Sequence, residues 1–154
     1  MDAKTTFLHG DLEEEIYMKQ PEDFAVKGKK ELVCKLKKPL YWLKQSPRMW
    51  YWKFDMFIWG HGFTKIKAYH CVYFRLIGDH VIYLILYVDD MLLVGNDKEI
   101  IQDLKTQLSS KFDMKYLGAA NYILSMEIKR DRTKMKIWLN QRNYVKTILQ
   151  RFNM

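Results

Sequence analysis

The chain has 154 residues, of which 49% are apolar and 15% aromatic, so it can bury a core and is not expected to be disordered. Twenty-six Lys and Arg against eighteen Asp and Glu give a net charge of +8, which favours a nucleic-acid partner over a basic surface without one. The longest apolar run, Val81–Val88, is too short to cross a bilayer as a helix, and Cys34 and Cys71 make no disulfide framework. With no secretory signal in the sequence, we expect a reduced, intracellular protein.

The first forty residues predict short elements. A helical or turn-like piece is expected after Asp2, followed by a strand that ends at Pro21. A turn over residues 27–30 then leads into a second strand, Leu32–Leu36, flanked by lysines.

A helix is predicted to start at Ser46, with Ser46 as the N-cap and Pro47 at the first helical position. Apolar residues follow at helical spacing, and two glycines after the stripe should end the helix. Because three of its tryptophans fall within this amphipathic pattern, we expect them in the core rather than as stacking platforms for bases: Trp50, Trp52 and Trp59.

Two strands, Cys71–Leu76 and Val81–Val88, are predicted next, and the strand pattern resumes after Asp90. Asn96 and Glu99 resemble a capping box, which predicts a second helix with an apolar stripe.

A hairpin is expected around residues 131–134, followed by a final helix capped by Asn140. This helix is expected to bury four apolar side chains: Tyr144, Ile148, Leu149 and Phe152. The order of elements predicts an α+β fold, an antiparallel sheet with helices packed on one face.

The most distinctive feature is a pair of adjacent carboxylates, Asp89 and Asp90, inside an otherwise apolar stretch. Asp is depleted in strands and two ionised neighbours repel, so a solvated turn or a divalent cation should offset the cost. Asp-Asp is a poor match to the two-residue hairpin turns, and both interpretations remain open on spacing alone. A two-metal site needs carboxylates from more than one element, for which Asp2 is the candidate. The acidic stretch from Asp11 to Glu15 is interpreted as a solvated face.

Four blocks in order along the chain, "MDAKTTFLHGDLEEEIYMKQPEDF", "LVCKLKKPLYWLKQSPRMWY", "YLILYVDDMLLVG" and "YILSMEIKRDR", resemble the reverse transcriptases of copia-type long-terminal-repeat retrotransposons. The resemblance implies a palm, a sheet with helices on one face, in a single partial domain over 1–154. It also implies that the fingers N-terminus, the thumb and the RNase H are absent. RNA-directed DNA polymerisation by two-metal nucleotidyl transfer is the implied activity.

The resemblance also implies roles for single residues. Asp2, Asp89 and Asp90 would be catalytic and would hold two Mg²⁺ or Mn²⁺ ions, and Phe7 would lie under the sugar of the incoming deoxynucleotide. The implied partners are an RNA or DNA template–primer, deoxynucleotides and the remainder of a Pol polyprotein, with no membrane, in a cytoplasmic retrotransposon particle. Two further basic residues would contact the template–primer backbone, although they could equally solvate a helix start: Lys44 and Arg48.

Four positions depart from the family pattern, which has Gly in place of Trp42 and Ser125 and an acid in place of Tyr69 and Tyr116. A catalytically dead retrotransposon remnant is therefore a second interpretation. A third, an unrelated basic RNA-binding α+β domain, is disfavoured because no strand carries the aromatic pattern of an RNA-recognition motif.

The isolated chain is not expected to polymerise. Met1 directly precedes Asp2, so we expect Asp2 to lack the strand pairing that would hold a metal ligand in place.

Overall fold

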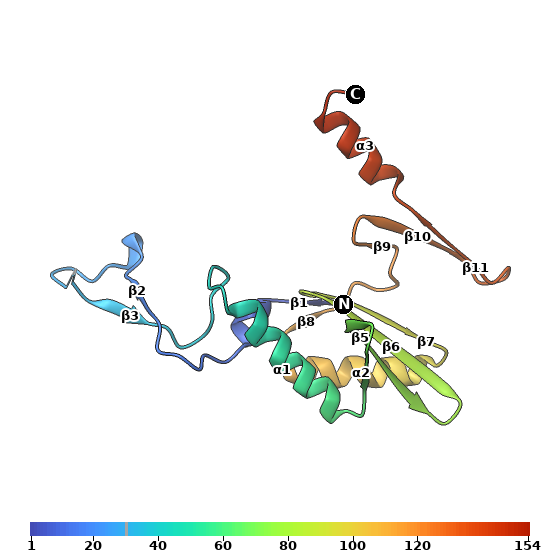
Figure 1. Cartoon of the computed structure of the whole chain (residues 1–154), viewed down its shortest axis with the longest axis horizontal. Coiled ribbons are helices and arrows are strands. Elements are labelled where there is room, and N and C mark those ends of the chain that lie inside the picture. The colour runs from blue at the N-terminus through green and yellow to red at the C-terminus, as the bar shows by residue number, and fades with distance from the viewer. Residues whose placement is uncertain (30) are drawn as a thin grey trace. The chain divides into compact units, whose positions relative to one another are not determined.

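The computed structural model describes residues 1–29 and 31–154. The chain divides into two compact units, Met1–Lys115 and Tyr116–Met154, and each is considered by itself. Figure 1 shows the elements of both units.

The first unit is built on a six-stranded antiparallel sheet with the order β4-β5-β6-β7-β1-β8. The two-residue strand β1, at the very start of the chain, lies inside the sheet between β7 and β8. The bounds are β1 Asp2–Ala3, β4 Thr64–Ile66, β5 Tyr69–Ile77, β6 His80–Tyr87, β7 Asp90–Gly95 and β8 Met114–Lys115.

Helices α1, Ser46–Gly60, and α2, Lys98–Lys111, supply the other side of the core (Figure 1). Alternate strand residues point toward them, because successive side chains of a strand face opposite ways. The helices and strands share one cluster of buried side chains, which includes Trp50, Phe54, Ile58, Tyr73, Ile82, Leu84, Met91, Leu104 and Leu108. The predicted α+β fold, an antiparallel sheet with helices on one face, is confirmed in this unit.

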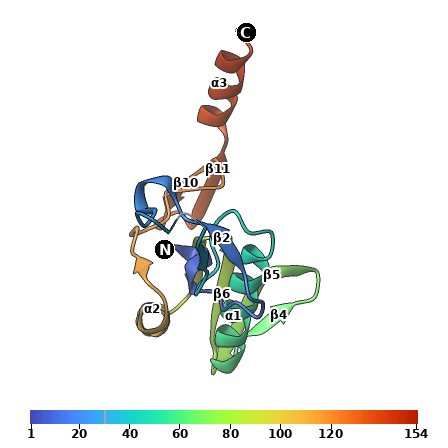
Figure 2. The same ribbon diagram turned by 90° about the vertical axis from the view of Figure 1, so that its left-hand side faces the viewer.

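The remaining elements of the first unit are short. A 3₁₀ turn, η1, covers Thr6–His9, and a separate two-stranded ribbon pairs β2, Tyr17–Lys19, with β3, Val33–Lys35 (Figure 2). Between them a second 3₁₀ turn, η2, covers Glu22–Phe24. The predicted turn over 27–30 includes Lys30, which lies outside the described residues.

The second unit contains the predicted hairpin and final helix. A three-stranded sheet has the order β11-β10-β9, with β9 Tyr122–Ile123, β10 Met126–Asp131 and β11 Lys136–Asn140, and α3 covers Arg142–Arg151. The prediction that this helix buries its apolar stripe is wrong. Tyr144 is 44% exposed, Leu149 39% and Phe152 66%, while Ile148 is half-buried. The stripe is amphipathic in sequence, but no residue of α3 is buried.

Three predicted helix caps are also wrong in detail. Residue 45 caps α1, and Ser46 is instead buried inside the helix, where its hydroxyl donates to the Leu40 carbonyl at 2.6 Å. Asp97 caps α2, while the Asn96 side chain accepts from the Val81 amide in strand β6. Residue 141 caps α3, and the Asn140 side chain accepts from the amide two residues later.

The tryptophans of α1 divide between core and surface. Trp50 is 2% exposed, as expected, but Trp52 is 56% and Trp59 70% exposed, so the expectation that all three lie in the core is wrong. Trp50, Phe54 and Ile58, at i, i+4 and i+8, form the buried face, which leaves 52 and 59 on other faces of the helix. The helix ends as predicted at Gly60, with Gly62 at a φ of +77°.

None of the described helices is both long enough and apolar enough to cross a membrane.

Candidate active site

A two-residue turn, Val88 and Asp89, joins β6 to β7, and Tyr87 pairs with Asp90 across it. Val88 has a φ of 56°, whereas Asp89 does not have a positive φ, which is the pattern of a type II′ hairpin turn. The indole Nε1 of Trp50 donates to the Val88 carbonyl at 2.7 Å, so helix α1 holds this turn from the core side.

Asp2 lies directly opposite Asp90, because β1 pairs with β7 in the register Asp2↔Asp90. Two backbone hydrogen bonds fix this register: the Ala3 amide donates to the Asp89 carbonyl at 2.9 Å, and the Met91 amide donates to the Met1 carbonyl at 2.8 Å. Directly paired residues of an antiparallel sheet present their side chains on the same face. The expectation that Asp2 lacks strand pairing is therefore wrong, since β1 has a partner strand on each side.

The carboxylates of this cluster repel one another. Burial is the main cause that raises the pKa of Asp90 above its ordinary value, and the neighbouring charges of Asp89 and Asp2 raise it further. Asp2 and Asp90 are half-buried and Asp89 is exposed. A divalent cation would relieve this repulsion, and carboxylate oxygens are the ligands that Mg²⁺ and Mn²⁺ prefer, so the donor chemistry fits the implied metal.

Asp2 and Asp90 form a pair with Asp89 nearby, but the three do not form a complete metal-binding site. Within residues 1–29 and 31–154, no three His, Cys, Asp or Glu side chains are grouped so that they could hold a metal ion. Asp2 and Asp90 face each other across β1 and β7, and Asp89 is adjacent in the turn.

Lys115 is a candidate site residue that the sequence pattern did not reveal. It pairs with Asp2 from the other side, through the register Asp2↔Lys115 between β1 and β8, so its exposed side chain shares a face with Asp2 and Asp90. Two-residue strands carry no measurable hydrophobic period, so only the sheet register could place this lysine beside the carboxylates.

The other residues implied by the resemblance lie in the segment 1–60. Phe7 is half-buried in η1, with its ring centroid 4.7 Å from that of Tyr41. Lys44 and Arg48 are both exposed, and Arg48 lines a cavity of about 250 Å³ together with Glu13, Glu14, Gln45, Met49 and Trp52. Trp42, where the family pattern has Gly, is 96% exposed.

The acidic stretch after η1 makes ion pairs at the surface. Asp11 accepts from Lys53 at 2.7 Å and from Lys38 at 3.3 Å, and the hydrogen bond from Lys53 is the main cause that lowers its pKa. Glu15 pairs with Lys35. Asp11 and Glu15 thus form ion pairs with neighbouring lysines at the surface, in agreement with a solvated acidic face.

Comparison with known families identifies the chain. The sequence profile of the family described as reverse transcriptase (RNA-dependent DNA polymerase) matches residues 1–154. The chain belongs to this reverse transcriptase family. Its six-stranded antiparallel sheet, with the carboxylates at the β6–β7 turn, is consistent with a partial reverse-transcriptase palm.

Several Pol polyproteins of transposons are similar to this chain. The chain is 57% identical over 155 residues to the retrovirus-related Pol polyprotein from transposon TNT 1-94 of Nicotiana tabacum, covering all of the chain and 12% of that protein. It is 36% identical to the polyprotein from transposon RE1 of Arabidopsis thaliana, of which it covers 10%. Against the putative transposon Ty5-1 protein of Saccharomyces cerevisiae it is 34% identical over 128 residues, 83% of the chain and 42% of that protein. No solved structure matches the chain. The predicted resemblance to copia-type retrotransposon reverse transcriptases is confirmed, and the chain spans about a tenth of its plant relatives.

Proposed function

We propose that this chain contributes the metal-binding carboxylates of an RNA-directed DNA polymerase within a longer Pol polyprotein. The observation that carries the proposal is the register that sets Asp2 opposite Asp90, next to Asp89 in the turn, in a chain of the reverse transcriptase family. The proposed substrates are a template–primer of RNA or DNA and deoxynucleotides.

Asp2, Asp89 and Asp90 are the proposed ligands of two Mg²⁺ or Mn²⁺ ions. Such ions, when bound, stabilise the charge on the attacking and leaving oxygens of an in-line phosphoryl displacement. The chain's own residues position these carboxylates: β1 and β7 fix Asp2 against Asp90, and Trp50 holds the turn that carries Asp89. Lys115, which pairs with Asp2 from the other side, is proposed to attract the anionic nucleotide.

The proposed roles of the remaining residues follow from their positions. Phe7, half-buried beside Tyr41, is proposed to contact the sugar of the incoming nucleotide, and the exposed Lys44 and Arg48 to contact backbone phosphates. A solvent-exposed indole at position 42 is proposed to hinder the approach of the primer–template pair.

Primer extension on an RNA template with Mg²⁺ or Mn²⁺ tests the proposal. The chain spans only 12% of its tobacco relative, so we expect little extension by residues 1–154 and clear extension by a polypeptide with the flanking Pol sequence restored. In the longer polypeptide, Asp89→Asn and Asp90→Asn should each abolish extension. Full extension by either variant would contradict the assignment of these carboxylates.

Metal binding is tested separately from extension. Mn²⁺ added to the 154-residue chain should broaden the NMR signals around the β6–β7 turn, and the double variant Asp89→Asn, Asp90→Asn should remove that broadening. Equal broadening in the double variant would exclude this metal site. Metal binding by a restored polypeptide that does not extend any primer would identify the chain as a catalytically dead remnant.

A further inference from the structure

The ribbon formed by β2 and β3 has one exposed face. Tyr17 pairs with Lys35 and Lys19 with Val33, so these four side chains lie on the same face, while the pair of Met18 and Cys34 points the other way. Tyr17 is 54% and Val33 56% exposed, and both lysines are exposed. The face therefore presents two ammonium groups on a diagonal next to an aromatic ring and its hydroxyl.

A carboxylate of the same chain already occupies this face. Glu15 accepts a hydrogen bond from the Tyr17 hydroxyl at 2.9 Å and another from the Lys35 ammonium. The hydrogen bonds from Lys35, first, and from Tyr17, second, lower the pKa of Glu15 and so favour its anionic form. The hydroxyl and the ammonium thus converge on one anionic group at the surface, where exchange for another anion involves little desolvation.

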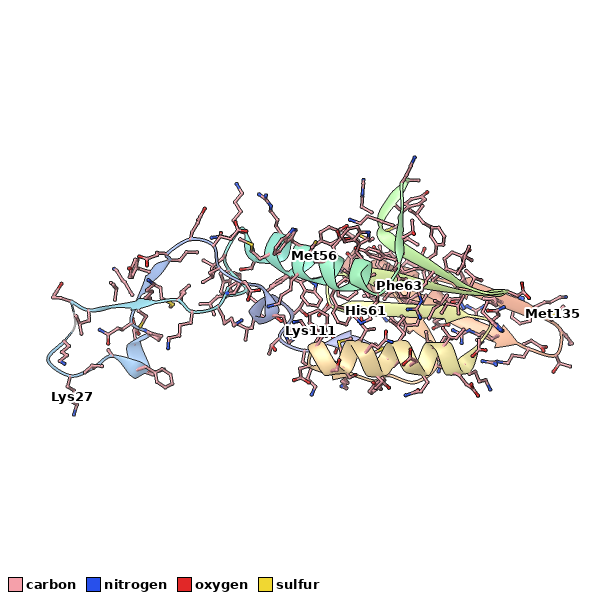
Figure 3. All side chains as sticks on the ribbon, turned by 90° about the horizontal axis from the view of Figure 1, so that it is seen from below. Lys27, Met56, His61, Phe63, Lys111 and Met135 are labelled. Carbon is pink, nitrogen blue, oxygen red and sulfur yellow. The ribbon has the colours of Figure 1, made fainter. Side chains whose placement is uncertain are left out.

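The ribbon and the residues that directly follow it are basic, whereas the stretch before it is acidic. Side-chain hydrogen bonds hold the loop between the two strands. Residues 16–38 contain seven lysines and three acids, a net charge of +4. The Gln20 side chain closes the loop between the strands: its amide nitrogen donates to the Lys29 and Leu32 carbonyls, each at 2.8 Å, and its oxygen accepts from the Val26 amide at 2.9 Å. The loop carries a further exposed lysine, Lys27 (Figure 3). These three bonds tie Val26, Lys29 and Leu32, in the described part of the loop, to the end of β2.

We propose that the exposed face of the ribbon, made of Tyr17, Lys19 and Lys35, binds backbone phosphates of a nucleic acid, and that Glu15 occupies the phosphate position when no nucleic acid is bound. Lysine and tyrosine are among the side chains that usually contact phosphates, and an exposed aromatic ring beside them can stack on a base. That the polyanion is a template or primer rests on the proposed function, but this face does not include the carboxylates of the candidate active site.

The test measures binding of the 154-residue chain to a short labelled single-stranded RNA by fluorescence anisotropy, without divalent metal and over a range of salt concentrations. Lys35→Gln and Lys19→Gln should each weaken binding several-fold and make the slope of log K against log salt shallower by about 0.7, the value for one lost phosphate contact on a single strand. Tyr17→Phe should also weaken binding. Glu15→Gln should tighten it several-fold, beyond the change given by a control that removes one acid elsewhere, Asp103→Asn on α2.

Lys98→Gln on α2 is the matched control for the lysines, because it removes the same charge from an exposed lysine away from the ribbon. Equal effects of Lys98→Gln and Lys35→Gln, or weaker binding in Glu15→Gln, would overturn the proposal. So would equally tight binding of an acidic polypeptide such as polyglutamate with the same dependence on Lys35. Loss of folding cannot imitate the expected result, since two variants on one face must change affinity in opposite directions. Failure of polymerisation leaves this result untouched, because the binding assay contains no divalent metal and requires no extension of a primer.

Discussion

At the scale of single residues, Val88 is strained, because a β-branched side chain at a φ of 56° clashes with its own backbone. The strain costs the folded state about 1–3 kcal/mol, and glycine would relieve it. Glycine also loses more backbone entropy on folding, which costs roughly 0.5–1 kcal/mol. Since Val88 is 48% exposed and contributes little burial, we expect Val88→Gly to stabilise the chain by about 1 kcal/mol in urea unfolding. Val88→Ala, which keeps the Cβ atom, should gain much less. A destabilised glycine variant would show that the turn is not strained.

Trp50 holds the same turn through one hydrogen bond, which its indole Nε1 donates to the Val88 carbonyl. Trp50→Phe removes the hydrogen bond to the Val88 carbonyl while leaving an aromatic ring against Phe54 and Phe112. We expect a loss of about 1–3 kcal/mol in the free energy of unfolding, because a partly buried carbonyl is left unpaired. Trp52→Phe, the same change at an exposed site of the same helix, should alter stability by less than about 0.5 kcal/mol. Similar losses in the two variants would contradict the role given to the Trp50 indole.

At the scale of elements, the N-terminus of α2 should respond to pH. The backbone amides of Ile100 and Glu99 donate to Asp97 and lower its pKa below its ordinary value of 3.8. A depressed folded-state pKa means that the stabilisation is present above the unfolded value and is lost as the pH falls through the folded value. We therefore expect the difference in thermal midpoint between the native chain and Asp97→Asn to shrink as the pH falls from 5 toward 2. A difference that does not change over this window would exclude Asp97 as a charged cap.

Whether a segment forms a helix or a strand could be predicted from the sequence where its pattern of apolar residues extends over many residues. The buried stripe Trp50–Phe54–Ile58 and the strands around residues 71–95 were predictable, because each repeats a helical or alternating pattern over several residues. The caps were not predictable in detail, since the Ser46 and Asn96 side chains form hydrogen bonds with residues that precede their helices, Leu40 and Val81, instead of with the first helical amides. These bonds depend on the packing of neighbouring segments.

The candidate site was predictable only in part for the same reason. The carboxylates of Asp89 and Asp90 stand out because they interrupt an apolar run, and Asp2 was assigned through the family resemblance. Lys115 was missed because its place depends on which strand lies next to β1, and a two-residue strand leaves no pattern in the sequence.

At the scale of the whole molecule, all of the fully buried apolar side chains described belong to the unit Met1–Lys115. Local stability depends on buried apolar contacts, so the unit Tyr116–Met154 should open far more easily. We expect amides in β10, β11 and α3 to exchange with deuterium at least roughly tenfold faster than those in β6 and β7. Equal protection of the two groups of amides in hydrogen–deuterium exchange mass spectrometry would contradict this division.

The position of β1 between β7 and β8 also sets the timing of folding. Asp2 can take its place only after Asp90 and Lys115 have been synthesised, although it precedes both of them in the chain. At about 5–20 residues per second, the nascent chain waits for several seconds with this segment unpaired. Contacts of such long sequence separation also form slowly, so the carboxylate pair should be among the last features of the sheet to assemble.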